Sequence, residues 1–163
     1  MKASELMIPL REYLKPDMTL KEAVRLLQNV KKGEVMIGVK GLPVLDKSGK
    51  LVGMLSMTDI LRAILPVYLS MTDLGEFTWD GMLESLARKS GDKTVESVMT
   101  RDVLTVHEHD PILECVDHMV KRNIRRLPVQ DKTGRIVGMI YERDVFLAIT
   151  KAMQATEGSA IKK

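Results

Sequence analysis

Two stretches of the chain share one pattern of apolar and polar positions. In residues 42–59 and again in residues 127–144, a short apolar run is followed by a polar turn and then by a second apolar run. Ten of the 18 positions are identical at an offset of 85 residues. The pattern predicts a β-hairpin in each stretch, with Gly49 and Gly134 in turns that favour positive φ. The chain is therefore predicted to contain two copies of one unit.

A helix is predicted before each hairpin, because apolar residues recur there with helical spacing. These residues are Leu20, Ala23, Val24 and Leu27 in the first copy, and Ile112, Cys115, Val116 and Met119 in the second. Thr19 and Glu22 have the spacing of a capping box. In the second copy Asp110 is expected to be the N-cap, with Pro111 at the first helical position.

A second helix is predicted after each hairpin, carrying Ile60, Leu61 and Ile64 in one copy and Val145, Phe146 and Ile149 in the other. Each copy then reads as strand, helix, strand, strand, helix, which is a small α/β (α+β) unit. The expected organisation is repeat one at 1–65, a connector at 66–93, repeat two at 94–153 and a flexible tail at 154–163. The helices align at an offset of 92 rather than 85, so repeat one carries seven extra residues, which fall within Lys31–Gly41.

The connector carries three of the chain's six aromatic residues, Tyr68, Phe77 and Trp79. Trp79, Met82, Leu83 and Leu86 have the spacing of an amphipathic helix. Two interpretations stay open for this segment. It packs within the module, or it forms a dimer contact or a lid over a binding cleft.

Composition narrows the classes of function. A unit of roughly 60 residues is marginally stable alone, which favours packing of the two copies together. The chain has 25 basic and 22 acidic residues, a balance that does not indicate a nucleic-acid binder. Its one cysteine, Cys115, lies on an apolar helical face and is expected to be a buried structural thiol. No signal peptide or membrane-length apolar run is visible, so a cytoplasmic, soluble protein is expected.

The candidate chemistry lies where each hairpin leads into its second helix. A helix N-terminus offers free N–H groups that suit phosphate, and Ser56 and Asp59 stand at the first of these junctions. Asp59 either caps the helix or accepts hydrogen bonds from two neighbouring ligand hydroxyls. At the second junction Tyr141 replaces the serine, yet Asp144 remains.

Cations distinguish the two junctions. Arg143 stands beside Asp144, and Arg125 and Arg126 precede the second hairpin, where guanidinium groups can hold phosphate bidentately. The matching positions in the first copy are Lys40 and Gly41. The two sites are therefore expected to differ, and the second has more cations for phosphate. The alternative interpretation is that these arginines are solvated surface residues.

The doubled Leu-Pro-Val, Asp, Gly, Val-Gly and Asp pattern resembles a pair of CBS domains, the cystathionine-β-synthase module also called a Bateman module. The openings Ser97-Val98-Met99-Thr100 and Val103-Leu104-Thr105-Val106 resemble it too. The resemblance implies two repeats packed through their sheets about a pseudo-twofold axis. It also implies two clefts that bind AMP, ADP, ATP or S-adenosylmethionine as a regulatory ligand, with no cofactor required.

The resemblance also assigns roles to residues. Asp59 and Asp144 would hold ribose hydroxyls, Ser56 would contact phosphate, and Thr105 with residues beside Pro128 would line the base pocket. Tyr141 departs from the family, which has Thr or Ser there. The complete expected ligand-binding set is Lys40, Pro43, Ser56, Asp59, Val103, Thr105, Arg125, Arg126, Pro128, Tyr141, Arg143 and Asp144.

No catalytic or metal site is expected. His107 and His109 are two positions apart, so on a strand they point in opposite directions, and no further ligand cluster is in view. The leading hypothesis is a nucleotide-sensing regulatory module, homodimeric by family resemblance, that acts on a separate effector protein. The alternative is a dimerisation or interaction module with vestigial clefts. Nucleic-acid binding through the arginines is a weaker third hypothesis, and no membrane partner is expected.

Overall fold

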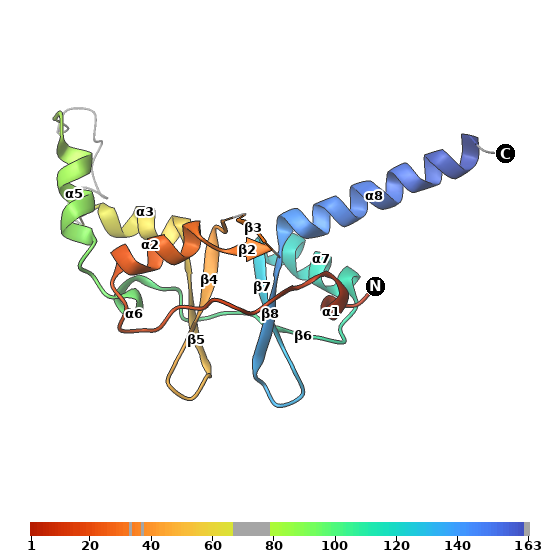
Figure 1. The fold of residues 1–163 in the computed structure, drawn as a ribbon, viewed down its shortest axis with the longest axis horizontal. Coiled ribbons are helices and arrows are strands. Elements are labelled where there is room, and N and C mark those ends of the chain that lie inside the picture. The colour runs from red at the N-terminus through yellow and green to blue at the C-terminus, as the bar shows by residue number, and fades with distance from the viewer. Residues whose placement is uncertain (33, 37, 67–78, 162–163) are drawn as a thin grey trace. The chain divides into compact units, whose positions relative to one another are not determined.

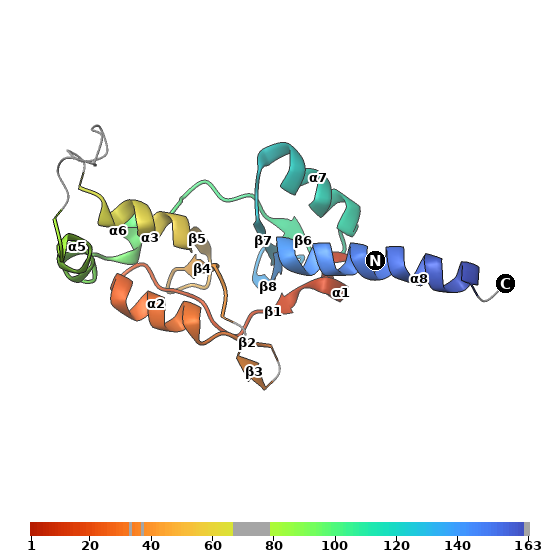
Figure 2. The ribbon, with the colours of Figure 1, turned by 90° about the horizontal axis from the view of Figure 1, so that it is seen from above.

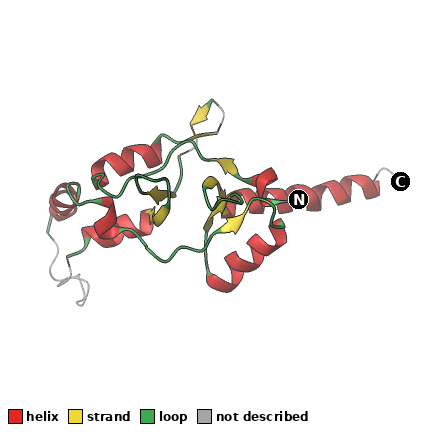
Figure 3. Ribbon diagram, turned by 90° about the horizontal axis from the view of Figure 1, so that it is seen from below, coloured by secondary structure: helices red, strands yellow, loops and turns green. Residues whose placement is uncertain are grey.

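The structure is a computed structural model that describes residues 1–32, 34–36, 38–66 and 79–161. The chain divides into two compact units, and neither is a continuous stretch. Unit 1 combines residues 1–11 with residues 104–163, and unit 2 is residues 12–103. Both contain helices and strands, as Figure 3 shows, which confirms the mixed α/β class expected from the sequence.

Unit 2 holds the first predicted hairpin, formed by β4 (Gly41–Leu45) and β5 (Leu51–Ser56). Before it come the helix α2 (Leu20–Gln28) and a small antiparallel pair, β2 (Lys31–Lys32) and β3 (Val35–Met36), which lies within the predicted insertion. The helices α3 (Met57–Ile64), α5 (Met82–Ser90) and α6 (Val95–Val98) follow the hairpin.

Unit 1 holds the second predicted hairpin, formed by β7 (Arg126–Gln130) and β8 (Ile136–Tyr141). Its other elements are α1 (Ala3–Leu6), β1 (Ile8–Pro9), β6 (Val106–His107), α7 (Ile112–Arg122) and α8 (Glu142–Ile161). The four strands form one sheet in the order β1-β8-β7-β6, with β6 parallel to β7 and the other pairs antiparallel.

The opening segments of the two repeats are exchanged between the units. Residues 1–11 open the first repeat, yet β1 pairs with β8, placing Ile8 opposite Met139. In unit 2 the segment that opens the second repeat takes the same place, with Thr100 opposite Met54 and reciprocal backbone bonds of 2.8 Å. Each hairpin is therefore flanked by a segment that opens the other repeat.

Two glycines make these approaches possible. A Cβ built on Gly53 would lie 2.8 Å from the Thr100 carbonyl oxygen and 2.6 Å from the Met99 sulfur. A Cβ on Gly138 would meet the Ile8 carbonyl oxygen at 2.9 Å and the Met7 sulfur at 2.6 Å. The repeated Gly therefore marks the point where the exchanged backbone crosses the strand.

The two hairpin turns have the same chemistry. Oδ1 of Asp46 accepts hydrogen bonds from N and Oγ of Ser48, at 2.9 and 2.6 Å, and from Lys50 N at 3.0 Å. Asp131 accepts the matching three bonds in the second turn. The hydrogen bond from Ser48 is the main cause that lowers the pKa of Asp46. Gly49 and Gly134 both have φ of 82°, which confirms the predicted turn conformation.

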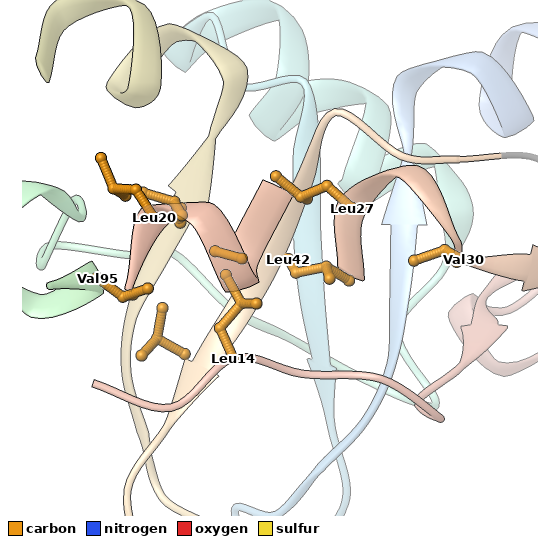
Figure 4. Packing of buried hydrophobic residues seen from close by; sticks show 9 residues of the cluster. Leu14, Leu20, Leu27, Val30, Leu42 and Val95 are labelled. Carbon is orange, nitrogen blue, oxygen red and sulfur yellow. The ribbon is translucent and has the colours of Figure 1, made fainter. Parts of the chain in front are cut away.

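Each unit has its own aliphatic core. Figure 4 shows the core of unit 2, where Leu20 and Leu27 of α2, Leu42 of β4, and Leu14 come together, with Val95 of α6 beside them. In unit 1 the core includes Cys115 and Met119 of α7, Leu127 and Val129 of β7, and Ile140 of β8. The apolar stripes predicted for α2 and α7 supply these contacts, so the prediction that both segments are helices with one buried face is confirmed.

The predicted cap of α7 is wrong. Thr19 caps α2 as expected, accepting from Glu22 N at 3.2 Å. Asp110 does not cap α7, because its carboxylate accepts instead from His107 N at 2.7 Å. Pro111 occupies the N-cap position, since its pairing with Lys2 and the 3.0 Å bond from Ile112 N to the Met1 carbonyl keep it extended.

The helix α8 differs from the sequence expectation in two ways. It continues to Ile161, across a segment predicted to be a flexible tail, and extends well past α7 in Figures 1 and 2. No proline interrupts this stretch, and each added residue gains a helical hydrogen bond. Of its predicted apolar face, Val145 is buried but Phe146 is 61% exposed and Ile149 is 39% exposed. Only part of the stripe therefore faces the core.

The described part of the connector, residues 79–93, belongs to unit 2. The predicted helix is present as α5, which lies against α3 (Figure 2). It begins at Met82, after Trp79, and of its predicted apolar face Trp79 and Leu83 are exposed. Met82 and Ser90 are buried, and the Ser90 hydroxyl donates to the Ala63 carbonyl at 3.3 Å. Lys93 Nζ donates to the same carbonyl at 2.7 Å and so satisfies the C-terminus of α3. Tyr68 and Phe77 lie outside the described residues.

Gly53→Ala is expected to destabilise the protein by about 1–3 kcal/mol, because the carbonyl that its Cβ meets belongs to backbone and cannot rotate away. Urea unfolding followed by circular dichroism measures the change. Gly91→Ala is the matched control, since its Cβ would meet nothing closer than 3.5 Å. Equal stability of the two variants would contradict the close crossing of residues 99–100 over β5.

Candidate functional site

The predicted residues Ser56, Asp59, Tyr141 and Asp144 lie at the open ends of the hairpins, opposite the turns, where the second strand of each leads into a helix. In unit 2, Gly41 pairs with Ser56, and the Lys40 carbonyl accepts from Met57 N at 2.8 Å. The same bond joins the Arg125 carbonyl to Glu142 N at 2.8 Å in unit 1. The two junctions therefore share one backbone frame, and they differ in the side chains that it presents.

At the first junction Ser56 and Asp59 form a reciprocal cap on α3. The Ser56 hydroxyl accepts from Asp59 N at 3.3 Å and donates to Asp59 Oδ2 at 2.9 Å. Oδ2 also accepts from Ser56 N at 2.9 Å. Both side chains are buried, Asp59 to 4% exposure. The capping interpretation of this pair therefore holds in the structure, and the single proton of the Ser56 hydroxyl is used within the chain.

The other oxygen of Asp59 is also hydrogen-bonded. Arg62 Nη1 donates to Oδ1 at 3.2 Å, although the Arg62 side chain is 70% exposed. The Thr100 hydroxyl donates to the same oxygen at 3.0 Å. Because Thr100 belongs to the exchanged segment, Asp59 joins that segment to the start of α3.

The second junction has a different set of side chains on the same frame. Arg126 pairs with Tyr141 at the positions that Gly41 and Ser56 occupy in unit 2. Burial is the main cause that raises the pKa of Tyr141 above its ordinary value of 10.0, with Asp144 adding to the rise and Arg126 opposing it. The phenol, the guanidinium and the carboxylate therefore interact electrostatically, which brings three predicted site residues together.

The remaining predicted cations are on the surface. Arg125 Nε lies 4.0 Å from Glu142 Oε2, and both side chains are more than 60% exposed. Arg143 and Lys40 are exposed as well. An exposed pair of this kind contributes little to stability, so Arg125 can turn toward another anion at small cost.

A third strand borders each junction. Val106 pairs with Val129 in parallel register, so Thr105 lies beside the buried Pro128. In unit 2 the bridge from Leu14 to Val44 places residue 13 beside Pro43 in the same way. Val103 is the last residue of unit 2, one position before the segment that enters unit 1.

Two residues of the junctions were not predicted from the sequence. Tyr13, 40% exposed, occupies in unit 2 the place of Thr105. Thr100 contacts Asp59, and its counterpart in unit 1 is Ile8, because each lies opposite the Met that follows the repeated Gly. Aligning the segments before the helices at the offset of 92 pairs both sets of residues, so the signal was present in the repeat.

The described residues contain no group of three or more His, Cys, Asp or Glu that could hold a metal ion. His107 Nε2 lies 3.3 Å from Gln130 Nε2. Cys115 is fully buried, and desolvation is the main cause that raises its pKa to about 11. This thiol is therefore protonated at neutral pH, as expected for a structural residue. Within the same described part of the chain, no helix combines the length and apolar character needed to cross a bilayer.

Comparison with known proteins places this architecture in a family. A sequence model of the CBS domain matches residues 3–66 and 95–151, the two repeats with their opening segments. The chain belongs to the CBS domain family and carries two such domains. It is 36% identical over 125 residues to the uncharacterized protein MJ1426 of Methanocaldococcus jannaschii, a match that covers 68% of this chain and 73% of that protein.

Solved structures show the same fold. The crystal structure of CBSX2 in complex with AMP matches with a TM-score of 0.65 and 27% identity, covering 93% of this chain and 98% of that one. MJ1225 of M. jannaschii, proposed as an archaeal homolog of g-AMPK, matches with a TM-score of 0.68 and 26% identity, covering 91% of this chain and 47% of that one. Some relatives are much longer: the chain spans 21% of an L-aspartate semialdehyde sulfurtransferase.

The stability of the protein is expected to fall as the pH rises above about 10, and Tyr141 is the cause. A group whose pKa is raised on folding stabilises the fold below its unfolded value and loses that contribution as the pH rises through its folded value. Urea midpoints measured for the native protein and for Tyr141→Phe, at neutral and at alkaline pH, separate this contribution. An identical pH dependence in both proteins would contradict the assignment.

Proposed function

We propose that the protein is a regulatory module that binds an adenine nucleotide, AMP, ADP or ATP, and passes the resulting conformational change to a partner protein. The likeness to CBSX2, whose crystal structure contains AMP and which aligns over 93% of this chain, is the observation that carries the proposal. The start of α8, with Tyr141, Arg126 and Asp144 beside it, supplies the groups that such a ligand needs.

Each part of a nucleotide has a match at this junction. The ribose hydroxyls donate to the Asp144 carboxylate, and the phosphate accepts from the guanidinium groups of Arg125 and Arg126. The positive end of α8 adds to the attraction for phosphate. The base lies against Thr105 and Pro128, which border the junction in register. Val103, Pro43, Lys40 and Arg143 complete the proposed binding set.

The proposed module is non-catalytic and cytoplasmic, and it needs no cofactor. S-adenosylmethionine is a further proposed ligand, because it carries the same adenosine group with a cationic centre in place of phosphate. The nucleotide changes the activity of the effector only through its differential affinity for the module's conformations. The activity of an effector that binds both conformations equally would not change when the nucleotide binds.

Titration calorimetry with AMP, ADP, ATP and S-adenosylmethionine tests the binding. Asp144→Ala is expected to cost about 1.5–3 kcal/mol of binding free energy for each hydrogen bond to the charged carboxylate that is lost. Asp117→Ala is the matched control, since Asp117 is a surface carboxylate of the same unit that pairs with Lys121 at 2.7 Å. The absence of heat for all four ligands at millimolar concentration would contradict the proposal.

A homodimer is proposed as the assembled form, and exposed apolar side chains support it. Phe146 and Met153 of α8 and Leu113 and Val120 of α7 are all more than 60% exposed. Grouped apolar side chains of this kind on a surface mark interaction sites. The second candidate function is a dimerisation or interaction module whose binding sites are vestigial. The hydrogen-bonded Asp59 favours it, because that carboxylate already has partners within the chain.

Phe146→Asp is expected to shift the protein from dimer to monomer while leaving the fold intact, since the ring is 61% exposed. Sedimentation velocity of the native protein and the variant measures the shift. Lys151→Asp, an exposed change on the same helix, is the control and should leave the dimer intact. A native protein that is monomeric at all concentrations would contradict the proposed assembly.

A further inference from the structure

The helix α7 carries two exposed rows of side chains next to each other. Leu113 and Val120 form an apolar row and are 78% and 76% exposed. Glu114 and Lys121 form a charged row one position further along, and both side chains are more than half exposed. Residues seven apart lie on one face of a helix, because seven residues make nearly two turns. Each row therefore runs along the helix axis, with its two members near opposite ends of α7.

The two rows are complementary to themselves. When a second copy of α7 lies antiparallel to the first across a twofold axis, the two ends of each row are exchanged. Leu113 then meets Val120 of the second copy, and Glu114 meets Lys121 of the second copy. Antiparallel packing also places the positive end of each helix dipole beside the negative end of the other, whereas in a parallel pair like ends would adjoin. The apolar contact and the charge pattern therefore both fit a second copy of this chain.

The corresponding helix of the first repeat lacks both rows. At the offset of 92 residues, Lys21 and Gln28 of α2 stand in place of the apolar row, and Asn29 stands in place of Lys121. Both repeats have the same helix at this point of the fold, so the fold does not require the rows. Self-complementarity is a property of α7 alone among these two helices.

The length of α7 shows how much of the contact it can provide. The helix has 11 residues and is therefore about 16 Å long. A stable dimer buries roughly 800 Å² on each protein, which is more than one face of so short a helix supplies. The helix α8 contacts α7 in the same unit, and its Phe146 and Met153 are exposed. These apolar side chains are available for the rest of the contact.

We infer that α7 pairs antiparallel with α7 of a second copy, through Leu113 against Val120 and Glu114 against Lys121. The inference rests on the proposed homodimer and names the helix and the residue pairs that hold it together. Because each chain uses the same surface, the pairing leaves no copy of that surface free, and the assembly closes at two chains.

Exchanging the charges gives the sharpest test. Glu114→Lys places two lysines opposite each other at both ends of the paired helices, and Lys121→Glu does the same with two glutamates. Each variant alone should raise the dimer dissociation constant roughly 10-fold at low ionic strength. An equimolar mixture of the two variants should dimerise as tightly as the native protein, because every contact then joins a lysine to a glutamate.

Sedimentation velocity of each variant, of the mixture and of the native protein measures these constants. A mixture that dimerises no better than the separate variants would overturn the antiparallel pairing. Native-like dimerisation of both separate variants would overturn it as well.

Val120→Lys tests the apolar row and has a matched control in the other repeat. The variant should be monomeric at concentrations where the native protein is dimeric, because the lysine charge would have to be buried against Leu113 of the second copy. Gln28→Lys makes the same exposed change at the corresponding position of α2 and should remain dimeric. Thermal unfolding followed by circular dichroism should show both variants folded, and a dimeric Val120→Lys protein would overturn the inference.

The failure of the inference and the failure of the homodimer give different results. A native protein that is monomeric at all concentrations would refute both. A native dimer that Phe146→Asp dissociates, but that Val120→Lys and the two charge variants leave intact, would overturn the pairing of α7 and keep the proposed homodimer.

Discussion

The crossing of an extended segment over a glycine is the contact on which each unit depends. At Gly53 and at Gly138 a backbone carbonyl approaches so closely that no side chain fits between. In both units the crossing segment comes from the opening of the other repeat. A repeat of roughly 60 residues buries too little surface to be stable alone. The exchange of opening segments gives each hairpin a neighbouring extended segment from the other repeat. Neither unit can therefore fold completely without residues from both repeats.

The same crossing positions the chemistry. The residue after each crossing methionine lies opposite the methionine that follows the repeated glycine, and in unit 2 its hydroxyl donates to Asp59. In unit 2 this residue is Thr100, a hydrogen-bond donor, and in unit 1 it is Ile8, which is not. The exchanged segment is thus one of the places where two junctions that share a backbone frame differ. Sequence repetition preserved the frame and let the side chains at the two junctions diverge.

Local patterns made much of the fold predictable. The hairpins follow from apolar runs around an Asp and a Gly, and the turn residues adopt the expected positive φ. The stripes of α2 and α7 were predictable because helical periodicity reports which face is buried. The capping interpretation of Ser56 and Asp59 came from spacing alone, since the bonds that it requires span only three residues.

What the sequence did not predict depends on contacts between distant residues. The bond from Thr100 to Asp59 spans 41 positions, and nothing local to either residue indicates it. Asp is a residue type that is favoured at helix N-caps, yet the pairing of Lys2 with Pro111, and not Asp110, decides where α7 begins. The exposure of Phe146 likewise follows from which face of α8 packs against unit 1, which its apolar character does not determine.

Hydrogen–deuterium exchange with and without AMP tests the central claim most directly, because it reports the two junctions separately in one experiment. The account predicts that AMP slows exchange of the amides where β8 leads into α8, around Tyr141 and Asp144. Unchanged exchange of these amides at a saturating concentration of AMP, or slowing at the β5–α3 junction alone, would contradict it.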